Sequence, residues 1–186
     1  ALSGGIDSIV LSDILLKINK TIPFKLFFFH MNYNMHSKSK LMQDYCNDFA
    51  LKNNVKFFNK SIDSNKIFKI NFESNARKYR YQELKNICLR NNINYILTAH
   101  HENDQIETIY MCKKNNSSWI SKIGIREKFH LLKNNKNKIT VLRPMLSVNK
   151  ESIIKYAKMN KLKFYDDPTN LDSKFLRNKI RLELNS

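Results

Sequence analysis

The stretch Ser3-Gly4-Gly5-Ile6-Asp7-Ser8 decides the fold of this chain. The sequence holds only three glycines, and two of them stand side by side here, directly before an apolar series with helical spacing in residues 9–15. Such a helix start brings bare backbone N–H groups, two serine hydroxyls and the positive end of the helix dipole to one spot. A phosphate group is the ligand that this arrangement fits. The plainer alternative is an ordinary helix start with Ser3 or Asp7 as its cap.

The rest of the chain alternates between apolar runs of strand length and segments with helical spacing. We expect helices at 9–20, 41–52, 72–91, 151–160 and 174–184, a further helix directly after His100, and strands at 24–29, 55–58, 95–99 and 140–142. This rhythm is typical of βαβ units and predicts an α/β fold with a doubly wound parallel sheet. Only Ala1 and Leu2 precede the glycine loop, so we expect the first strand to be truncated. Ligands of such folds bind at the carboxyl ends of the strands, where the glycine loop and the His100-His101 segment would both lie.

Length and composition are those of one globular domain over residues 1–186, with 42% apolar and 11% aromatic residues. No apolar run approaches the ~18 residues that cross a bilayer, so no membrane partner is expected. The three cysteines, Cys46, Cys88 and Cys112, are widely spaced and form no Cys-x-x-Cys. This pattern favours a reducing compartment and buried thiols over a disulfide framework or a zinc ribbon.

The net charge is +17, from 33 Lys and Arg against 16 Asp and Glu. An excess of this size favours a polyanionic partner, RNA or DNA rather than a membrane surface. The chain is also rich in Asn, Lys and Ile, as drift in an AT-rich genome would produce. Codon bias is therefore a second source of the positive charge.

A second constellation follows the strand expected at 95–99. His101, Asp104, Glu107 and Thr108 recur at i, i+3, i+6 and i+7, close to one stripe of a helix. Groups so placed could bind a cationic substrate and move its protons, or hold Mg²⁺ between carboxylate and phosphate. The alternative is a solvated polar face with local pairs.

Two arginines in the helix expected at 72–91 also share a face. Arg77 and Arg80 are spaced i, i+3, and either guanidinium could hold a carboxylate or a phosphate through two hydrogen bonds. The alternative is again an ordinary surface face.

Together these motifs resemble a known family. The hexapeptide matches the pyrophosphate loop (PP-loop) of the N-type ATP pyrophosphatases and lacks the Gly-Lys-Ser/Thr ending of a Walker loop. The tRNA(Ile)-lysidine synthetase family is similar to this chain from end to end, through five further motifs: Asn75-Ala76-Arg77-Lys78-Tyr79-Arg80-Tyr81, His101-Glu102-Asn103-Asp104-Gln105-Ile106-Glu107-Thr108, Arg143-Pro144-Met145-Leu146, Asp166-Asp167-Pro168-Thr169-Asn170, and Arg177-Asn178 with Arg181.

The resemblance implies an adenine nucleotide alpha hydrolase-like fold and a two-step reaction. ATP adenylates the oxygen at carbon 2 of the wobble cytidine of tRNA(Ile) with a CAU anticodon, and free L-lysine then displaces AMP to form lysidine. ATP binding is assigned to Ser3, Gly4, Gly5, Ile6, Asp7 and Ser8, with Mg²⁺ between Asp7 and the phosphates. Catalysis is assigned to Asp7, Arg80, His101, Asp104 and Glu107, substrate binding to Arg77, Arg80, Asp104 and Glu107, and tRNA contacts to Arg143, Arg177 and Arg181. Which carboxylate is the base stays open.

The chain departs from the family at two turns. It has Tyr33-Asn34-Met35-His36 where relatives show His-Gly-Leu-Arg, and Asn115-Asn116-Ser117-Ser118 where they show Arg-Gly-Ser-Gly. Lost glycines predict eroded loop geometry. The carboxy-terminal tRNA-binding domains that relatives often carry have no counterpart in this sequence.

Two other functions remain open from the sequence. One is a related PP-loop tRNA thiolase, against which the isolated cysteines speak. The other is an eroded domain that binds tRNA or nucleotide without catalysis, against which the joint presence of Asp7, His101, Asp104 and Glu107 speaks. The family is often dimeric, and its location would be a bacterial cytoplasm or an organelle of bacterial descent.

Overall fold

A computed structural model describes residues 1–62, 72–114, 123–165 and 180 of the chain. Its elements are α1 (Ile6–Thr21), β1 (Phe27–Asn32), α2 (Ser39–Lys52), β2 (Lys56–Ser61), α4 (Phe72–Arg90), β3 (Tyr95–Leu97), α5 (Glu102–Lys114), β4 (Lys128–Lys133), β5 (Lys138–Leu142) and α6 (Lys150–Met159). The helices and strands expected within the described residues are found, with bounds within three residues of those expected; the strand expected at 24–29 is β1 at Phe27–Asn32. The segment 166–170 and the basic helix expected at 174–184 lie, apart from Ile180, outside the described residues.

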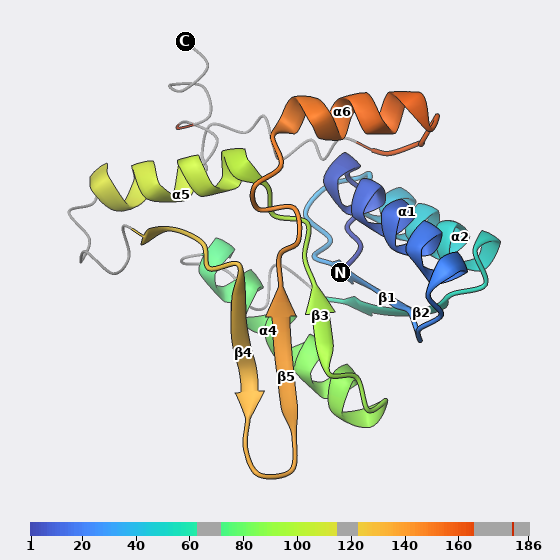
Figure 1. The fold of residues 1–186 in the computed structure, drawn as a ribbon, viewed down its shortest axis with the longest axis horizontal. Coiled ribbons are helices and arrows are strands. Elements are labelled where there is room, and N and C mark those ends of the chain that lie inside the picture. Colours follow the sequence, from blue (N-terminus) through green and yellow to red (C-terminus); the bar gives the residue numbers. More distant parts are fainter. Residues whose placement is uncertain (63–71, 115–122, 166–179, 181–186) are drawn as a thin grey trace.

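The strands form two small sheets that the amino-terminal residues join. β1 pairs with β2 in parallel, and β5 stands between β3, its parallel neighbour, and β4, its antiparallel neighbour. The backbone N–H of Leu2 donates to Phe29 O at 2.8 Å, and the nitrogen of Ala1 donates to Leu97 O at 2.9 Å. The two residues thus lie between β1 and β3, where Figure 1 places the amino-terminus, and they link the sheets into one twisted layer.

β4 is the strand that the sequence did not predict. Its residues alternate partly between polar and apolar and none is fully buried, as is typical of an edge strand. It forms a hairpin with β5, with an irregularity in the register between His130 and Leu132. The doubly wound parallel sheet is confirmed, with the addition of this antiparallel edge.

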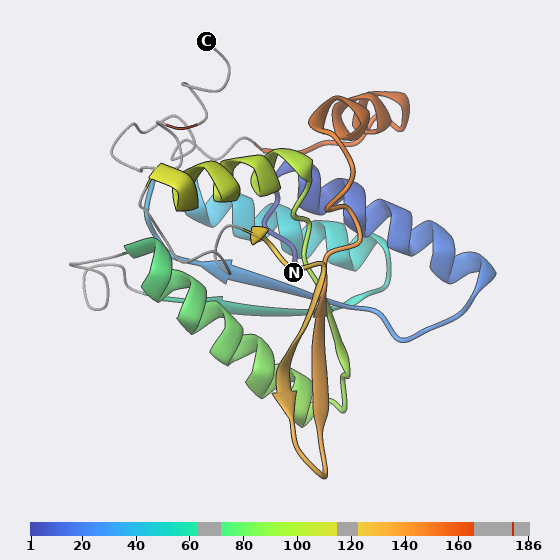
Figure 2. The same ribbon diagram turned by 60° about the vertical axis from the view of Figure 1, so that its left-hand side comes forward.

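Helices cover both faces of the sheet, as the alternating side chains of β1 require. Phe28 packs with Ile9 of α1 and Cys46 of α2, whereas Phe29 packs with Tyr81 and other residues of α4. Figure 2 shows α1 and α2 on one side of β1 and β2 and α4 on the other. The strand buried on both faces is Phe27–Asn32, three residues later than the apolar run at 24–29 predicts, and it includes the buried polar residues His30 and Asn32. No helix in the described part of the chain is long and apolar enough to cross a membrane.

Asparagine and lysine take the place of glycine at the helix ends. Three helices end in a Schellman motif, in which the left-handed residue is Asn54 after α2, Asn92 after α4 and Lys161 after α6, with φ of 55°, 53° and 50°. In each, the next residue donates its N–H to the carbonyl five positions back: Val55 to Ala50, Ile93 to Cys88 and Leu162 to Ala157. Asn is the non-glycine residue that best tolerates this conformation.

The same substitution preserves the turn after β1. Asn34 has φ of 51°, its N–H donates to Asn32 Oδ1 at 2.8 Å, and its amide donates to Ile62 O at 2.9 Å. Asn34 thus forms a left-handed turn at the position where relatives show glycine, which speaks against eroded geometry at residues 33–36. The second altered turn, 115–118, lies outside the described residues.

Candidate nucleotide and substrate site

The glycine loop leaves the start of α1 open. Gly5 is the N-cap, and no side chain caps the helix, so the alternative of a helix capped by Ser3 or Asp7 is wrong. The first N–H groups of a helix have no intrahelical acceptor, and they carry the positive end of its dipole. Backbone donors from Ile6 onward therefore face the loop.

The two serines of the loop form hydrogen bonds within the loop. Ser8 Oγ donates to Gly5 O at 2.9 Å and accepts from Ser3 N at 3.1 Å, and the two hydroxyls lie 3.0 Å apart. Ser8 is buried, whereas Ser3 is exposed. Both hydroxyls expected to contact a phosphate therefore bond within the loop, since Ser3 Oγ also accepts Gly5 N at 3.3 Å, but only Ser3 is exposed to a ligand.

Gly4 is the position that needs glycine. Its φ is +90°, and a Cβ added there would lie 3.3 Å from Cys46 Sγ. Its carbonyl accepts from Tyr165 N at 3.0 Å, which ties the loop to the segment after α6. Gly5 is less constrained, because a Cβ there would meet only Ser3 Oγ at 3.5 Å and Tyr165 O at 3.9 Å.

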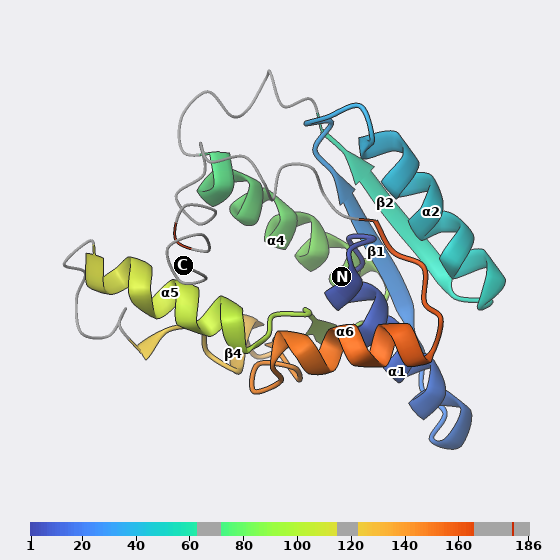
Figure 3. The same ribbon diagram turned by 90° about the horizontal axis from the view of Figure 1, so that it is seen from above.

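The second constellation lies against this loop. His101 Nε2 is 3.7 Å from Asp7 Oδ1 and 3.6 Å from Asp104 Oδ2, so the imidazole stands between the loop and α5. Asp7 Oδ1 also accepts a hydrogen bond from Lys150 Nζ at 2.5 Å. The amino ends of α1, α5 and α6 consequently meet beyond the carboxyl ends of β3 and β5, as Figures 1 and 3 show. Three positive dipole ends near one point favour an anion there.

The acidic residues of α5 are buried. Asp104 is 9% exposed and Glu107 is 3% exposed. Asp104 Oδ2 accepts the backbone N–H of His101 at 3.0 Å, the return bond of a capping box, and this bond fixes its direction. His101 is 5% exposed, and its Nδ1 has no hydrogen-bond partner among the described residues. Buried carboxylates beside an unpartnered imidazole nitrogen are suited to a cationic, proton-donating ligand.

His100 is a site residue that the sequence did not single out beyond its segment. Its Nδ1 lies 3.0 Å from Thr98 Oγ1. Burial lowers its pKa to about 3; the negative charge of Asp104 opposes this shift, and Arg143, Arg77 and Arg80 add to it. The imidazole is therefore neutral at physiological pH, and α4 lies close enough for its arginines to act on it.

The α4 arginines reach the site from its other side. Arg77 and Arg80 lie over the ring of Tyr81, with centroid distances of 5.4 and 6.0 Å. Arg80 also donates a hydrogen bond to Tyr33. Burial raises the pKa of Tyr33, and the charge and the hydrogen bond of Arg80 lower it in part. Both cations are thus placed where they could meet an anionic group of a ligand.

Arg143 does not lie on the surface where a tRNA contact was expected. It is 2% exposed, donates to Arg126 O, approaches Tyr81 Oη at 3.5 Å and lies over Phe129 at 4.9 Å. It anchors the β4–β5 hairpin to α4, and its burial speaks against direct RNA contact. Arg177 and Arg181 lie outside the described residues.

Lys150 is the residue that sequence reasoning missed. The only available signal was its position at the start of a helix that follows a parallel strand, where ligand-binding residues gather. Its contact with Asp7 joins residues 143 positions apart.

The side chains of the site offer few ligands for a metal ion. The described residues include no group of three His, Cys, Asp or Glu side chains that could hold a metal ion. Mg²⁺ in nucleotide sites needs only one or two carboxylates together with substrate phosphates, so Asp7 is a compatible donor.

Two of the cysteines lie on opposite faces of the sheet, Cys46 with α1 and α2 and Cys88 with α4, and burial raises their pKa to about 12 and about 11. They cannot share a cluster.

Comparisons with known proteins show the family to which the chain belongs. Two relatives named tRNA(Ile)-lysidine synthase, from Mesoplasma florum and Rickettsia typhi, are 36% and 32% identical to this chain over 99% of its length. The chain spans 44% and 41% of those two relatives. Among solved structures, the U34-tRNA thiolase NcsA from Methanococcus maripaludis with its [4Fe-4S] cluster has a TM-score of 0.77 and 18% identity, over 99% of this chain and 64% of the other. The family model described as PP-loop domain matches residues 1–186, and the chain therefore belongs to the PP-loop domain family.

Proposed function

We propose that this chain is the ATP-using domain of a lysidine-forming ligase. It adenylates the oxygen at carbon 2 of the wobble cytidine of tRNA(Ile) with a CAU anticodon and joins free L-lysine to that carbon, releasing pyrophosphate and AMP. The relatives' name supports this reading, as does one observation above all: His101 lies within 4 Å of both Asp7 in the loop and Asp104 in α5. A nucleotide at the loop and a second substrate at α5 would therefore be neighbours.

The first step needs positioning and charge neutralisation. The cytidine oxygen forms a bond to the α-phosphorus of ATP, and the bond to the β-phosphate breaks. The open N–H groups of α1 and the amino ends of α5 and α6 provide fixed positive partial charges for the phosphates. We assign Ser3 to Ser8 to this role, with Mg²⁺ on the phosphates and Asp7 as its protein partner. Arg77 or Arg80 would hold the α-phosphate or the carboxylate of lysine.

The second step needs a neutral lysine amine. The unperturbed pKa of such an amine is ~10.4, so deprotonation at pH 7 costs roughly 5 kcal/mol. The amine nitrogen bonds to carbon 2, the carbon–oxygen bond breaks, and AMP leaves with the oxygen. We assign Asp104 and Glu107 to bind the ammonium and take its proton. The imidazoles of His100 and His101 border the same space.

Labelled lysine tests the reaction. The protein is incubated with ATP, Mg²⁺, labelled lysine and total tRNA, and the nucleosides of the digested tRNA are separated. We expect the label in lysidine, dependent on ATP, with one AMP formed for each lysine joined. Label in no nucleoside, or ATP cleavage between the β and γ phosphates, would contradict the proposal.

A tRNA thiolase is the alternative that the solved neighbour suggests. Two of the three cysteines in the described part of the chain speak against it, because Cys46 and Cys88 are buried on opposite faces of the sheet and their raised pKa values keep both thiols protonated.

A further inference from the structure

The contact between Lys150 and Asp7 is a partly buried ion pair inside the proposed site. The ammonium and the carboxylate oxygen are 2.5 Å apart, and the two side chains are 33% and 29% exposed. An exposed pair between flexible chains contributes little, whereas a pair that is partly withdrawn from water is screened less. The positive charge of Lys150 therefore offsets the negative charge of Asp7 at the glycine loop.

The stability of α6 gives no reason for a lysine at position 150. Its N-cap is Asn149, whose side chain accepts Ser152 N at 2.8 Å, and the preceding loop is fixed by a bond from Glu102 N to Val148 O at 3.0 Å. Lys150 is the first residue of α6, where a cation faces the positive end of the helix dipole. This position is unfavourable for the helix itself, so the partner across the site, Asp7, is what makes it favourable.

Lys150 supplies a positive charge that the glycine loop itself lacks. Residues 1–8 contain no lysine or arginine, and their one charged side chain is Asp7. An uncompensated carboxylate in the first turn of α1 would repel the phosphates that the open N–H groups attract. We propose that Lys150 is a positioning residue of the nucleotide site: it bonds Asp7 through Oδ1 and offsets its charge, which leaves Oδ2 for Mg²⁺ and lets the loop accept the polyphosphate of ATP. This inference rests on the proposed function.

Binding of α,β-methylene ATP, measured by calorimetry on the whole chain, tests the role. Lys150→Met removes the charge and keeps most of the stem, and we expect the Kd to rise about tenfold. Lys150→Arg should restore most of the affinity. The matched control is Lys155→Met, which removes an exposed lysine of the same helix and should change the Kd less than about twofold. Equal Kd values for Lys150→Met and Lys155→Met would overturn the proposal.

The ion pair itself is tested without nucleotide. Under limiting acylating reagent, Lys150 should be labelled more slowly than Lys155, and Asp7→Asn should speed the labelling of Lys150 alone. An unchanged rate at Lys150 in Asp7→Asn would also overturn the proposal. A wild-type chain that binds no nucleotide analogue would instead contradict the proposed function. The labelling experiment uses no nucleotide, so its result does not depend on that function.

Discussion

At the scale of single residues, Asp104 has the largest part in the proposed reaction. Its carboxylate accepts the N–H of His101 as a helix cap and also faces the space assigned to the lysine amine. Asparagine can accept the same backbone bond through its side-chain oxygen, so Asp104→Asn separates the charge from the cap.

We expect Asp104→Asn to abolish incorporation of labelled lysine and to change the affinity for ATP by less than about threefold. The free energy of unfolding should fall by less than about 1 kcal/mol, because the cap survives. Glu102→Gln, which removes an exposed carboxylate of the same helix, is the matched control and should keep full incorporation. Undiminished incorporation in Asp104→Asn would remove Asp104 from the site.

His100 makes a pH-dependent contribution to stability. Its pKa is about 3 in the folded chain against an ordinary value near 6.5, so between these values the unfolded chain binds a proton that the folded chain does not. Stability should therefore decline as the pH falls through this window, by up to roughly 1.4 kcal/mol per pH unit from this residue. Urea unfolding from pH 7 to pH 4 should show a shallower decline for His100→Gln than for the wild type. Identical slopes, or an NMR titration of His100 with a midpoint near 6.5, would contradict its burial as a neutral group.

At the scale of the elements, the helix ends explain how a chain with three glycines keeps tight turns. Schellman motifs need a left-handed residue, and this chain supplies Asn54, Asn92 and Lys161. The left-handed conformation costs lysine free energy that asparagine is partly spared.

Lys161→Gly should therefore raise the free energy of unfolding by about 1 kcal/mol. Asn54→Gly should gain only a few tenths of a kcal/mol, because asparagine already tolerates the conformation. Urea unfolding of the two variants checks the order. A loss of stability in Lys161→Gly would mean that the left-handed turn after α6 is not formed in solution.

The elements also show what the sequence could and could not predict. β1 was predictable because Phe27 to Phe29 belong to an apolar run typical of a strand covered on both faces, although the expected range of 24–29 begins and ends three residues too early. β4 was missed because an edge strand alternates only partly and needs β5 beside it to form. In the site, the meeting of Asp7, His101 and Asp104 followed from the rule that loops gather at the carboxyl edge. Lys150 and the burial of Arg143 depend on contacts distant in sequence, which no local pattern contains.

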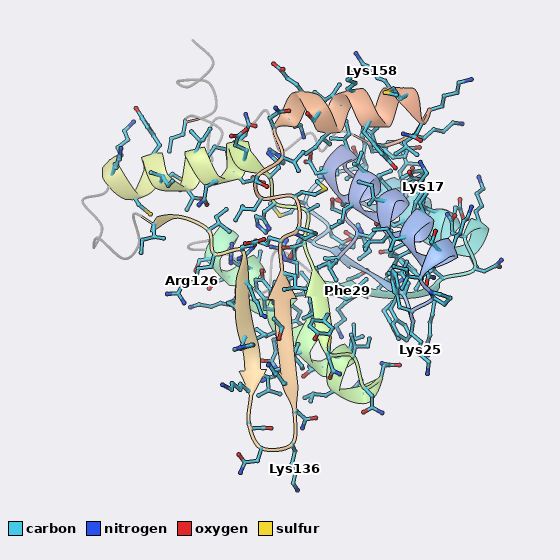
Figure 4. All side chains as sticks on the ribbon, viewed as in Figure 1. Lys17, Lys25, Phe29, Arg126, Lys136 and Lys158 are labelled. Atoms are coloured by element: carbon cyan, nitrogen blue, oxygen red, sulfur yellow. The ribbon has the colours of Figure 1, made fainter. Side chains whose placement is uncertain are left out.

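At the scale of the whole molecule, positive charge is widely distributed. Figure 4 shows labelled basic side chains at separate places, with Lys136 at the tip of the hairpin, Lys158 on α6 and Lys25 after α1. Such a distribution attracts a polyanion over a broad surface and does not select a sequence.

The affinity of the chain for tRNA should therefore depend steeply on salt. Neutralising even a few phosphates would lower the association constant at least tenfold between about 50 and 200 mM salt. Filter binding with total tRNA at several salt concentrations measures the slope. A flat titration would mean that the net charge of +17 reflects codon usage and not an RNA partner.

The central claim is that ATP and lysine meet at one edge of the sheet, between the glycine loop and α5. A crystal structure of the chain with α,β-methylene ATP and lysine tests this most directly. We predict the phosphates over the amino end of α1 and the lysine amine within about 3 Å of Asp104 or Glu107. Phosphates away from the loop, or a lysine bound elsewhere on the molecule, would contradict the account.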